Sequence, residues 1–266
     1  MKTIGEIVTL SGQFLAKLPR GKRIAEEIIA DVLGMTRMDL YLQFDRPLVE
    51  SELTHIRAKL KRCAKNEPVE YILGAVDFFG CRIQVDPRVL IPRPETEILV
   101  EKIAKQAKTG VLWDVCCGSG CIGISLKKAN PHLQVVLSDI DKGALAVAAQ
   151  NAALNGVEVT FVHGDLLEPF QGQKADWIVC NPPYVTEEEY QRLDPSVKDF
   201  EPKIALVGGI SVYERLAHVA DFLNPMGAFF FEIGCDQKTA LQTLFPKATI
   251  ECDWAGHPRF LFAQKS

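Results

Sequence analysis

Residues 111–120 read Val-Leu-Trp-Asp-Val-Cys-Cys-Gly-Ser-Gly. The first five have the apolar character of a buried strand, and the next five form a glycine loop before a helix expected over 122–128. Gly118 and Gly120 can adopt dihedrals that other residues avoid, and they let a ligand approach the main chain closely. The N-terminus of the following helix favours negative charge. The stretch therefore predicts a strand, a ligand-binding loop and a helix in succession.

Strands and helices alternate along the remainder of the chain. Strands are expected over 133–138, 157–162, 177–180 and 228–233, and helices over 141–154, 212–223 and 236–244. A last pair of strands, over 249–252 and 259–263, is expected to close the sheet as a hairpin. This alternation predicts an α/β fold with a doubly wound, mostly parallel sheet, in which ligands bind at the carboxyl ends of the strands.

The beginning of the chain has a different character. Apolar residues recur at helical spacing over 4–18, 24–33 and 53–63, and short polar breaks separate these stretches. They predict a small helical bundle over residues 1–65. Asn66-Glu67-Pro68 interrupts the pattern, and residues 66–91 are expected to be a linker that contains a β-hairpin around Gly80. The α/β domain is then expected over 92–266.

Composition limits the classes of function. The chain has 266 residues, of which 47% are apolar, and a net charge of −4, which disfavours broad charge-driven binding to nucleic acid. No apolar run is long enough for a membrane span, and Glu6, Ser11 and Lys17 interrupt the first apolar stretch. We therefore expect a cytoplasmic protein that makes no membrane contact.

The eight cysteines are expected to stay reduced in that compartment. No Cys-x-x-Cys pair is present, and the histidines stand at no convincing metal spacing. Cys116, Cys117 and Cys121 resemble a metal half-site, but they fit the glycine loop better. We therefore expect no metal.

Polar side chains stand at the ends of successive expected strands. Asp114 precedes the glycine loop, Asp139 ends the second strand, Asp165 ends the third, and Asn181 follows the fourth. A carboxylate at Asp139 can accept both hydroxyls of a ribose, and Asp165 lies where an adenine edge commonly lies in such folds. Helix N-caps are the alternative role for these two residues. Their succession favours a shared ligand cleft.

Two cofactors are compatible with this cleft. Residues 118–123 match the pattern G-x-G-x-x-G of nicotinamide dinucleotide sites. However, the first glycine falls four residues after Asp114, and an acidic residue at this place is better explained by S-adenosylmethionine.

Asn181-Pro182-Pro183-Tyr184 is the most informative stretch for chemistry. The prolines have no N–H, so their backbone offers only carbonyl acceptors, and Asn181 adds a side-chain carbonyl. Two carbonyls can hold the two N–H groups of an –NH2 and direct its lone pair towards an incoming methyl group. Tyr184 supplies a flat face or a hydroxyl beside them. A plain Pro-Pro turn after a strand is the alternative.

Together these residues resemble class I S-adenosylmethionine-dependent methyltransferases, and more narrowly the HemK/PrmC family, which methylates a glutamine in peptide chain release factors. Further stretches extend the resemblance over nearly the whole chain; they are 70–74, 78–80, 90–97, 199–202, 205–206 and 208–209. Asn-Pro-Pro-Tyr alone is shared with DNA and RNA amino-methyltransferases, but its combination with Arg93-Pro94-Glu95-Thr96-Glu97 is far more specific.

The resemblance implies a seven-stranded Rossmann-like sheet, S-adenosylmethionine as cofactor, release factors as partners and a substrate-docking role for residues 1–65. It implies N5-methylation of glutamine, in support of translation termination. The cofactor site would comprise Asp114, Cys116, Cys117, Gly118, Ser119, Gly120, Asp139, Asp165, Leu166 and Asn181. The substrate site would comprise Asn181, Pro182, Pro183 and Tyr184, with Asn181, Pro182 and Tyr184 catalytic.

The chain departs from the family at its glycine loop. The usual loop is close to Gly-Thr-Gly-Ser-Gly, whereas Cys116 and Cys117 replace its first two residues here. Cys116 cannot take a glycine-only conformation cheaply. Leu166 stands where an aromatic residue often stacks on the cofactor, and it can make only an apolar contact.

Three other functions compete with glutamine methylation. The first is an adenine-N6 or guanine-N2 amino-methyltransferase of DNA or RNA, which the acidic balance disfavours. The second is a non-catalytic cofactor-binding protein, which the intact Asn181-Pro182-Pro183-Tyr184 disfavours. The third is a nicotinamide oxidoreductase, which leaves the Pro-Pro turn unexplained.

Overall fold

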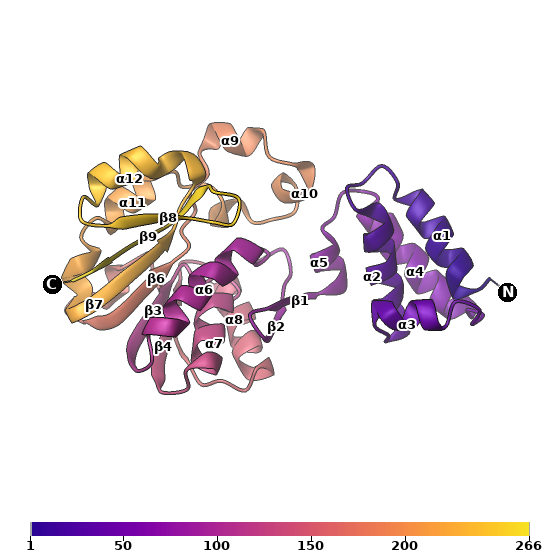
Figure 1. Cartoon of the computed structure of the whole chain (residues 1–266), viewed down its shortest axis with the longest axis horizontal. Coiled ribbons are helices and arrows are strands. Elements are labelled where there is room, and N and C mark those ends of the chain that lie inside the picture. Colours follow the sequence, from indigo (N-terminus) through magenta and orange to yellow (C-terminus); the bar gives the residue numbers. More distant parts are fainter. Residues whose placement is uncertain (1, 266) are drawn as a thin grey trace. The chain divides into compact units, whose positions relative to one another are not determined.

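A computed structural model describes residues 2–265, which form two compact units (Figure 1). The first unit contains the chain up to Gly74 together with Pro195–Phe200, and the second contains Ala75–Asp194 and the chain from Glu201 onward. Each unit has its own hydrophobic core. No helix among the described residues is both long and apolar enough to cross a bilayer.

The first unit is helical. Its helices are α1 (Ile4–Phe14), α2 (Gly21–Leu33), α3 (Arg37–Leu42), α4 (Glu50–Cys63), α5 (Val69–Leu73) and the short α10 (Pro195–Lys198). Thr3 begins α1 with a capping box, because its hydroxyl accepts from the Glu6 N–H while the Glu6 carboxylate accepts from the Thr3 N–H. Helical structure continues past Lys65 because α5 ends only at Gly74, whose φ is +80°.

The second unit contains a seven-stranded sheet with the strand order β5-β4-β3-β6-β7-β9-β8. The strands are β3 (Gly110–Val115), β4 (Leu133–Asp139), β5 (Thr160–His163), β6 (Ala175–Cys180), β7 (Leu223–Glu232), β8 (Thr249–Cys252) and β9 (Pro258–Gln264). The first five strands pair with one another in parallel, and β9 is antiparallel to both β7 and β8. The predicted fold class and closing hairpin are confirmed.

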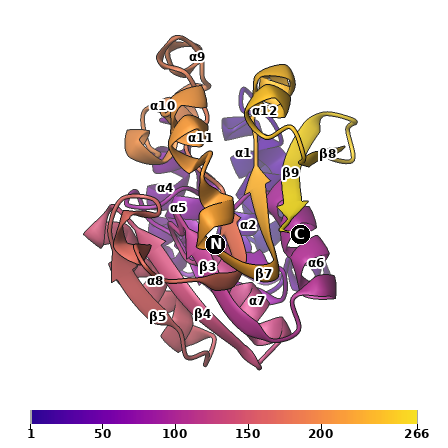
Figure 2. The ribbon, with the colours of Figure 1, turned by 90° about the vertical axis from the view of Figure 1, so that its left-hand side faces the viewer.

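Helices cover both faces of this sheet, as Figures 1 and 2 show. They are α6 (Pro94–Gln106), α7 (Cys121–Ala129), α8 (Lys142–Leu154), α11 (Ile210–Leu216) and α12 (Lys238–Leu244), whereas the short α9 (Glu187–Gln191) lies beyond the ends of the strands. Side chains alternate along β3. Trp113 and Val115 point into the core cluster that contains α11 residue Tyr213, whereas the Asp114 carboxylate meets the first turn of α7. Both faces of β3 are therefore buried.

The hairpin predicted around Gly80 is present. It consists of β1 (Ala75–Phe78) and β2 (Cys81–Gln84), which pair in an antiparallel register. Its two turn residues, Phe79 and Gly80, have φ values of +43° and +73°, as a two-residue turn of the primed type requires. The hairpin leads to Pro94, which occupies the first turn of α6, where its missing N–H costs nothing.

Three element boundaries differ from the predictions. β5 begins at Thr160, because the Val157 N–H instead bonds the Ala152 carbonyl at the end of α8. The helix predicted over 212–223 is divided into α11 and the 3₁₀ helix η3 (Val219–Phe222). β7 begins early, at Leu223, and its register with β6 shifts before Ala228, so the turn-forming residues 224–227 form an irregularity within the strand.

Candidate active site

A cleft of about 250 Å³ opens at the carboxyl ends of β3, β4 and β6. Most of the residues predicted for the cofactor line it, and so do two residues of the Asn-Pro-Pro-Tyr turn. The predicted residues in its wall are Cys116, Cys117, Gly118, Ser119, Asp139, Asp165, Leu166, Asn181 and Pro183. Asp114, Gly120, Pro182 and Tyr184 lie outside the lining.

The glycine loop depends on unusual backbone angles. Cys116, Gly118 and Gly120 have φ values of +59°, +54° and +78°. Nothing lies within 4 Å of a Cβ placed on Gly118, so only the dihedral angle of this residue favours glycine. At Gly120 a Cβ would also lie too close to a neighbour, 2.8 Å from Ile124 Cδ1. Cys116 therefore holds the left-handed conformation that is costly for a residue with a side chain.

The Asp139 carboxylate organises the loop from the end of β4. Its Oδ2 accepts from the Gly118 N–H at 2.8 Å, and its Oδ1 accepts from the Asp141 N–H at 2.9 Å. Burial raises the pKa of Asp139, although these backbone hydrogen bonds oppose the shift. Asp141, rather than Asp139, is the N-cap of α8, and its side chain accepts from the Gly143 N–H at 2.6 Å.

Asp114 lies beneath the loop and is completely buried. Its Oδ2 accepts from the Gly123 N–H at 2.8 Å, whereas its Oδ1 is buried and has no partner among the described residues. Burial raises its pKa to about 7. An unpaired carboxylate oxygen behind a glycine loop is suited to a cationic group of a ligand.

Gly123 is the third glycine of the loop pattern, and it has a packing role that the sequence analysis did not assign. A Cβ there would lie 2.3 Å from Leu137 Cδ2 and 3.0 Å from Asp114 Oδ2. Glycine thus lets α7 approach β4 and brings the Gly123 N–H to the Asp114 carboxylate.

Asp165 follows β5 and is paired with a residue that is distant in the sequence. Its Oδ2 accepts from Arg215 Nη2 at 2.8 Å, and Arg215 also reaches Glu168 at 3.2 Å. Arg215 lies on α11 and lines the cleft. Asp165 is therefore not a helix N-cap. Leu166 beside it has a φ of +48° and contributes apolar surface to the same wall.

The Asn-Pro-Pro-Tyr turn directly follows β6. Asn181 and Pro183 face the cleft, Pro182 is buried, and the Tyr184 ring packs against the core cluster on one face of the sheet. Within residues 2–265 the Asn181 side chain makes no hydrogen bond, so its amide is available to a ligand. Burial raises the pKa of Tyr184 to about 12, which keeps its phenol neutral and unsuited to act as a base.

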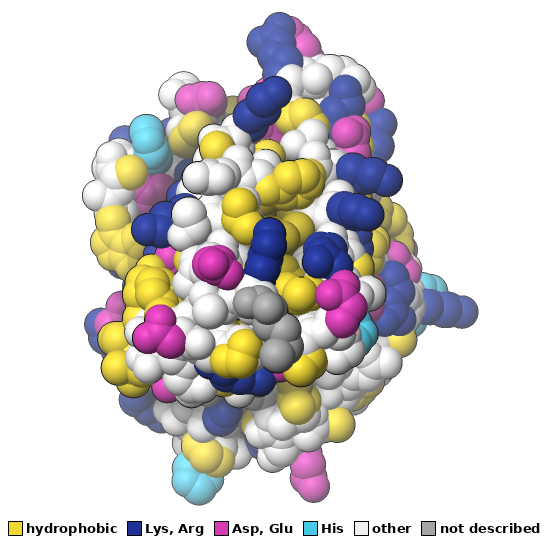
Figure 3. Space-filling view, turned by 90° about the vertical axis from the view of Figure 1, so that its right-hand side faces the viewer, with side chains coloured by type: hydrophobic (Ala, Val, Ile, Leu, Met, Phe, Trp, Pro, Cys, Tyr) yellow, Lys and Arg dark blue, Asp and Glu magenta, His cyan; other side chains and the backbone are white. Residues whose placement is uncertain are grey.

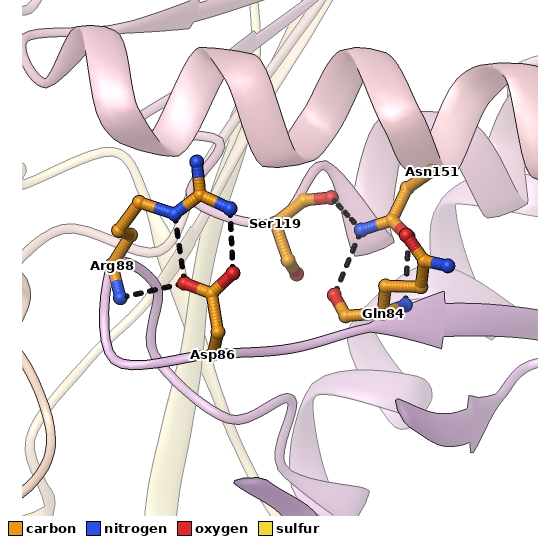
Figure 4. A network of polar contacts seen from close by, with 5 residues as sticks. All are labelled: Gln84, Asp86, Arg88, Ser119 and Asn151. Atoms are coloured by element: carbon orange, nitrogen blue, oxygen red, sulfur yellow. Dashed lines mark hydrogen bonds and ion pairs between the residues drawn. The ribbon is translucent and has the colours of Figure 1, made fainter. Parts of the chain in front are cut away.

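The segment after the hairpin supplies another wall of the cleft, which includes Arg88. Asn151 of α8 connects this segment to the glycine loop (Figure 4). Its Oδ1 accepts from the Gln84 N–H at 2.7 Å, and its Nδ2 donates to the carbonyls of Gln84 and Ser119 at 3.0 and 2.9 Å. Arg88 forms an ion pair with Asp86 at 2.6 Å. Sequence reasoning missed these residues because the Asn151 contacts span 67 and 32 positions.

Two family models match the chain. Residues 6–74 match the PrmC N-terminal domain, and residues 94–194 match the methyltransferase small domain. A release factor glutamine methyltransferase of Geobacter sulfurreducens is 37% identical, over 94% of this chain and 90% of the relative. The enzyme of the same name from Thermodesulfovibrio yellowstonii is 36% identical, over 100% of this chain and 99% of the relative.

The chain belongs to the release factor glutamine methyltransferase family. A Chlamydia trachomatis (serovar D) member is 40% identical, over 91% of this chain and 87% of the relative.

Solved structures place the fold among methyltransferases. One is a Thermus thermophilus 16S rRNA N2 G1207 methyltransferase in complex with AdoMet and guanosine, with a TM-score of 0.54 and 18% identity; the match covers 72% of this chain and 50% of that chain. Another is a ribosomal protein L11 methylase from Lactobacillus delbrueckii, with a TM-score of 0.51 and 23% identity, covering 69% and 86%. At these identities the likeness concerns the fold alone.

The cleft of this family member fits S-adenosylmethionine in its chemistry. The Asp139 carboxylate in the cleft wall offers negative charge to a cofactor that carries ammonium and sulfonium groups, and the unpaired Asp114 oxygen lies buried behind the glycine loop. The open space above Gly118 leaves its backbone accessible. No cluster of three or more potential metal ligands occurs within residues 2–265.

Proposed function

We propose that this chain transfers a methyl group from S-adenosylmethionine to the side-chain amide nitrogen (N5) of a glutamine in a peptide chain release factor. One observation carries the proposal: the unengaged Asn181 amide and the proline turn lie in the same cleft as the glycine loop and Asp139. The full-length likeness to curated members of the family supports the choice of substrate.

The turn would hold the substrate amide through acceptors. Asn181 Oδ1 and the Pro182 carbonyl would each accept one amide hydrogen and align the nitrogen for attack. When bound, S-adenosylmethionine supplies an electrophilic methyl group on sulfur. Asn181 Oδ1 and the Pro182 carbonyl would keep the nitrogen directed at that methyl group, and the amide proton would leave the nitrogen after the transfer. Alignment of this kind contributes several kcal/mol, and the two carbonyl dipoles stabilise the developing positive charge on nitrogen.

Asp114, Asp139 and the loop from Cys116 to Gly120 would hold the cofactor. Asp165 would accept from the adenine edge. Its ion pair with Arg215 fixes that carboxylate at the cleft wall, and Leu166 would contact the ring.

The helical unit would take part in docking the release factor. It carries exposed apolar side chains, and Figure 3 shows such side chains interspersed with Lys and Arg on the face in view. They include Leu10, Phe14, Met38, Leu42 and Val49.

Mass spectrometry of a purified release factor, incubated with the protein and S-adenosylmethionine, tests the function. We expect a gain of one methyl group on a glutamine side chain, and its loss with Asn181→Ala, while cofactor binding measured by calorimetry persists. Methyl transfer to DNA or RNA in a parallel reaction, with none to the release factor, would favour the nucleic-acid alternative instead.

A further inference from the structure

The Asn-Pro-Pro-Tyr turn has few hydrogen bonds with which to hold its position, although the two proline rings restrict its φ angles. Pro182 and Pro183 have no N–H, so they can donate no hydrogen bond to their surroundings. If Asn181 Oδ1 and the Pro182 carbonyl bind the substrate, these two acceptors cannot also form hydrogen bonds within the protein. The position of the turn must therefore be set by groups outside it.

One side of the turn is supported by residues 206–208. The Val185 N–H donates to the Leu206 carbonyl at 2.9 Å, and the Gly208 N–H donates to the Val185 carbonyl at 3.0 Å. A Cβ on Gly208 would stand 2.3 Å from the Pro183 carbonyl oxygen, so the glycine backbone lies directly against the turn. These contacts fix the chain that leaves the turn.

The other side is held by a single side chain, that of Gln237. Its Nε2 donates to the Tyr184 carbonyl at 2.8 Å, and its Oε1 accepts from the Gly234 N–H at 3.0 Å. Within the described part of the chain, this is the only side-chain hydrogen bond to residues 181–184. Gln237 ends the 3₁₀ helix η4 (Cys235–Gln237), which follows β7, the neighbour of β6 in the sheet.

An amide satisfies both partners at any pH, whereas a carboxyl group does so only when it is protonated. The Gly234 N–H is obligatorily a donor and the Tyr184 carbonyl obligatorily an acceptor, so the bridging side chain must accept at one atom and donate at the other. Gly234 also leaves room for the bridge, because a Cβ there would lie 3.0 Å from Gln237 Cδ.

We propose that Gln237 is a positioning residue for methyl transfer, which fixes the Asn-Pro-Pro-Tyr turn through the Tyr184 carbonyl and thereby aims the substrate amide. This inference rests on the proposed function, because it takes the turn as the seat of the amide. Gln237 is absent from the cleft wall, so its effect is transmitted through the backbone of the turn.

Gln237→Glu is the sharpest test, because it keeps the shape and the acceptor but loses the donor. At pH 8 the ionised carboxylate repels the Tyr184 carbonyl, and we expect kcat for release factor methylation to fall about 10- to 100-fold, with the dissociation constant for S-adenosylmethionine unchanged. At pH 6 protonation restores a donor, since burial beside a carbonyl raises the pKa of a carboxyl group. The activity of Gln237→Glu relative to the unaltered protein should therefore rise as pH falls.

Two variants complete the test. Gln242→Glu introduces the same charge on α12, where Gln242 Nε2 donates to the Ala248 carbonyl at 3.1 Å, and it should leave the pH profile unchanged. Gln237→Met removes both hydrogen bonds without adding charge, and its loss of kcat should not recover at low pH. If Gln237→Glu and Gln237→Met both methylate the release factor with the same kcat as the unaltered protein, the inference is overturned.

Hydrogen exchange separates this inference from the proposed function. Exchange in a peptide spanning residues 180–190 needs no substrate, and it should accelerate in Gln237→Met but not in Gln242→Glu. If the unaltered protein leaves the release factor unmodified, the proposed function fails, and the exchange result alone decides whether Gln237 holds the turn. Unchanged exchange would count against it.

Discussion

At the scale of single residues, the cleft combines strained backbone with buried charge. Cys116 holds a left-handed conformation, and Asp114 keeps an unpaired oxygen in the interior. Both features cost free energy in the isolated protein, and both lie at the expected cofactor site. A site that binds a cation is therefore expected to be stabilised when it is filled.

Cys116→Gly is expected to stabilise the protein. Relief of the left-handed strain is worth about 1–2 kcal/mol, and the extra backbone entropy of glycine costs about 0.5–1 kcal/mol. The free energy of urea unfolding should therefore rise by up to ~1.5 kcal/mol, less the packing that the Cys116 side chain makes against the core cluster. Gly118→Ala is the matched opposite, since it imposes the strain without a steric clash. A loss of stability in Cys116→Gly would contradict this account.

The stability of the cofactor-free protein should decrease with pH because of Asp114. Its pKa is about 7 in the folded state and about 3.9 in the unfolded chain, so the folded state binds the extra proton. The stability that this proton contributes to the folded state is fully present below about pH 4 and is lost as pH rises through about 7. In thermal melts at several pH values, the melting temperature should fall less with rising pH in Asp114→Asn than in the unaltered protein. An identical fall in both proteins would refute the assignment of this pH dependence to Asp114.

Asp114→Asn should also weaken S-adenosylmethionine binding, because it removes the negative charge. The asparagine side chain still accepts from the Gly123 N–H, so the loop keeps this hydrogen bond. Calorimetry of the unaltered protein should show affinity rising between pH 6 and pH 8 as Asp114 ionises. Affinity that is independent of pH would argue against a role for this carboxylate.

At the scale of elements, close approach of α7 to the sheet determines where the cofactor loop lies. Gly123→Ala would place a methyl group within 2.3 Å of Leu137 Cδ2 and force the helix outward. We expect a loss of about 1–3 kcal/mol in unfolding free energy. Gly12→Ala in α1 is the control: its Cβ would meet only ordinary contacts at 3.5 Å, so helix propensity should stabilise it by up to ~1 kcal/mol.

Most elements, and the order of site residues along the chain, could be predicted from local pattern. Asp139 and Asn181 could be placed because strand ends are visible in the sequence and parallel strands end at one edge of a sheet. Arg215, Gln237 and Asn151 could not be placed, because each acts through a contact that spans 32 or more positions. The irregularity in β7 was missed because Asn224 and Pro225 resemble a plain turn.

At the scale of the whole molecule, the residues that line the cleft lie within 88–183 and 204–215, and all of them belong to the second compact unit. A fragment of residues 75–266 is therefore expected to bind S-adenosylmethionine with nearly the affinity of the full chain. If the helical unit docks the release factor, methylation by the fragment should fall steeply through a raised KM. Calorimetry and steady-state kinetics would check the two expectations, and an unchanged KM would exclude a docking role.

The contacts between α8 and β2 have a consequence for solubility. Asn155 bonds both the N–H and the carbonyl of Arg82, at 3.1 and 2.8 Å, and Asn151 bonds both groups of Gln84. Two side-chain amides one helical turn apart thus take the place of a third strand beside the hairpin. The outer edge of β2 would otherwise be a template for intermolecular pairing. In this protein that edge is already occupied, so two copies cannot join there into a growing sheet.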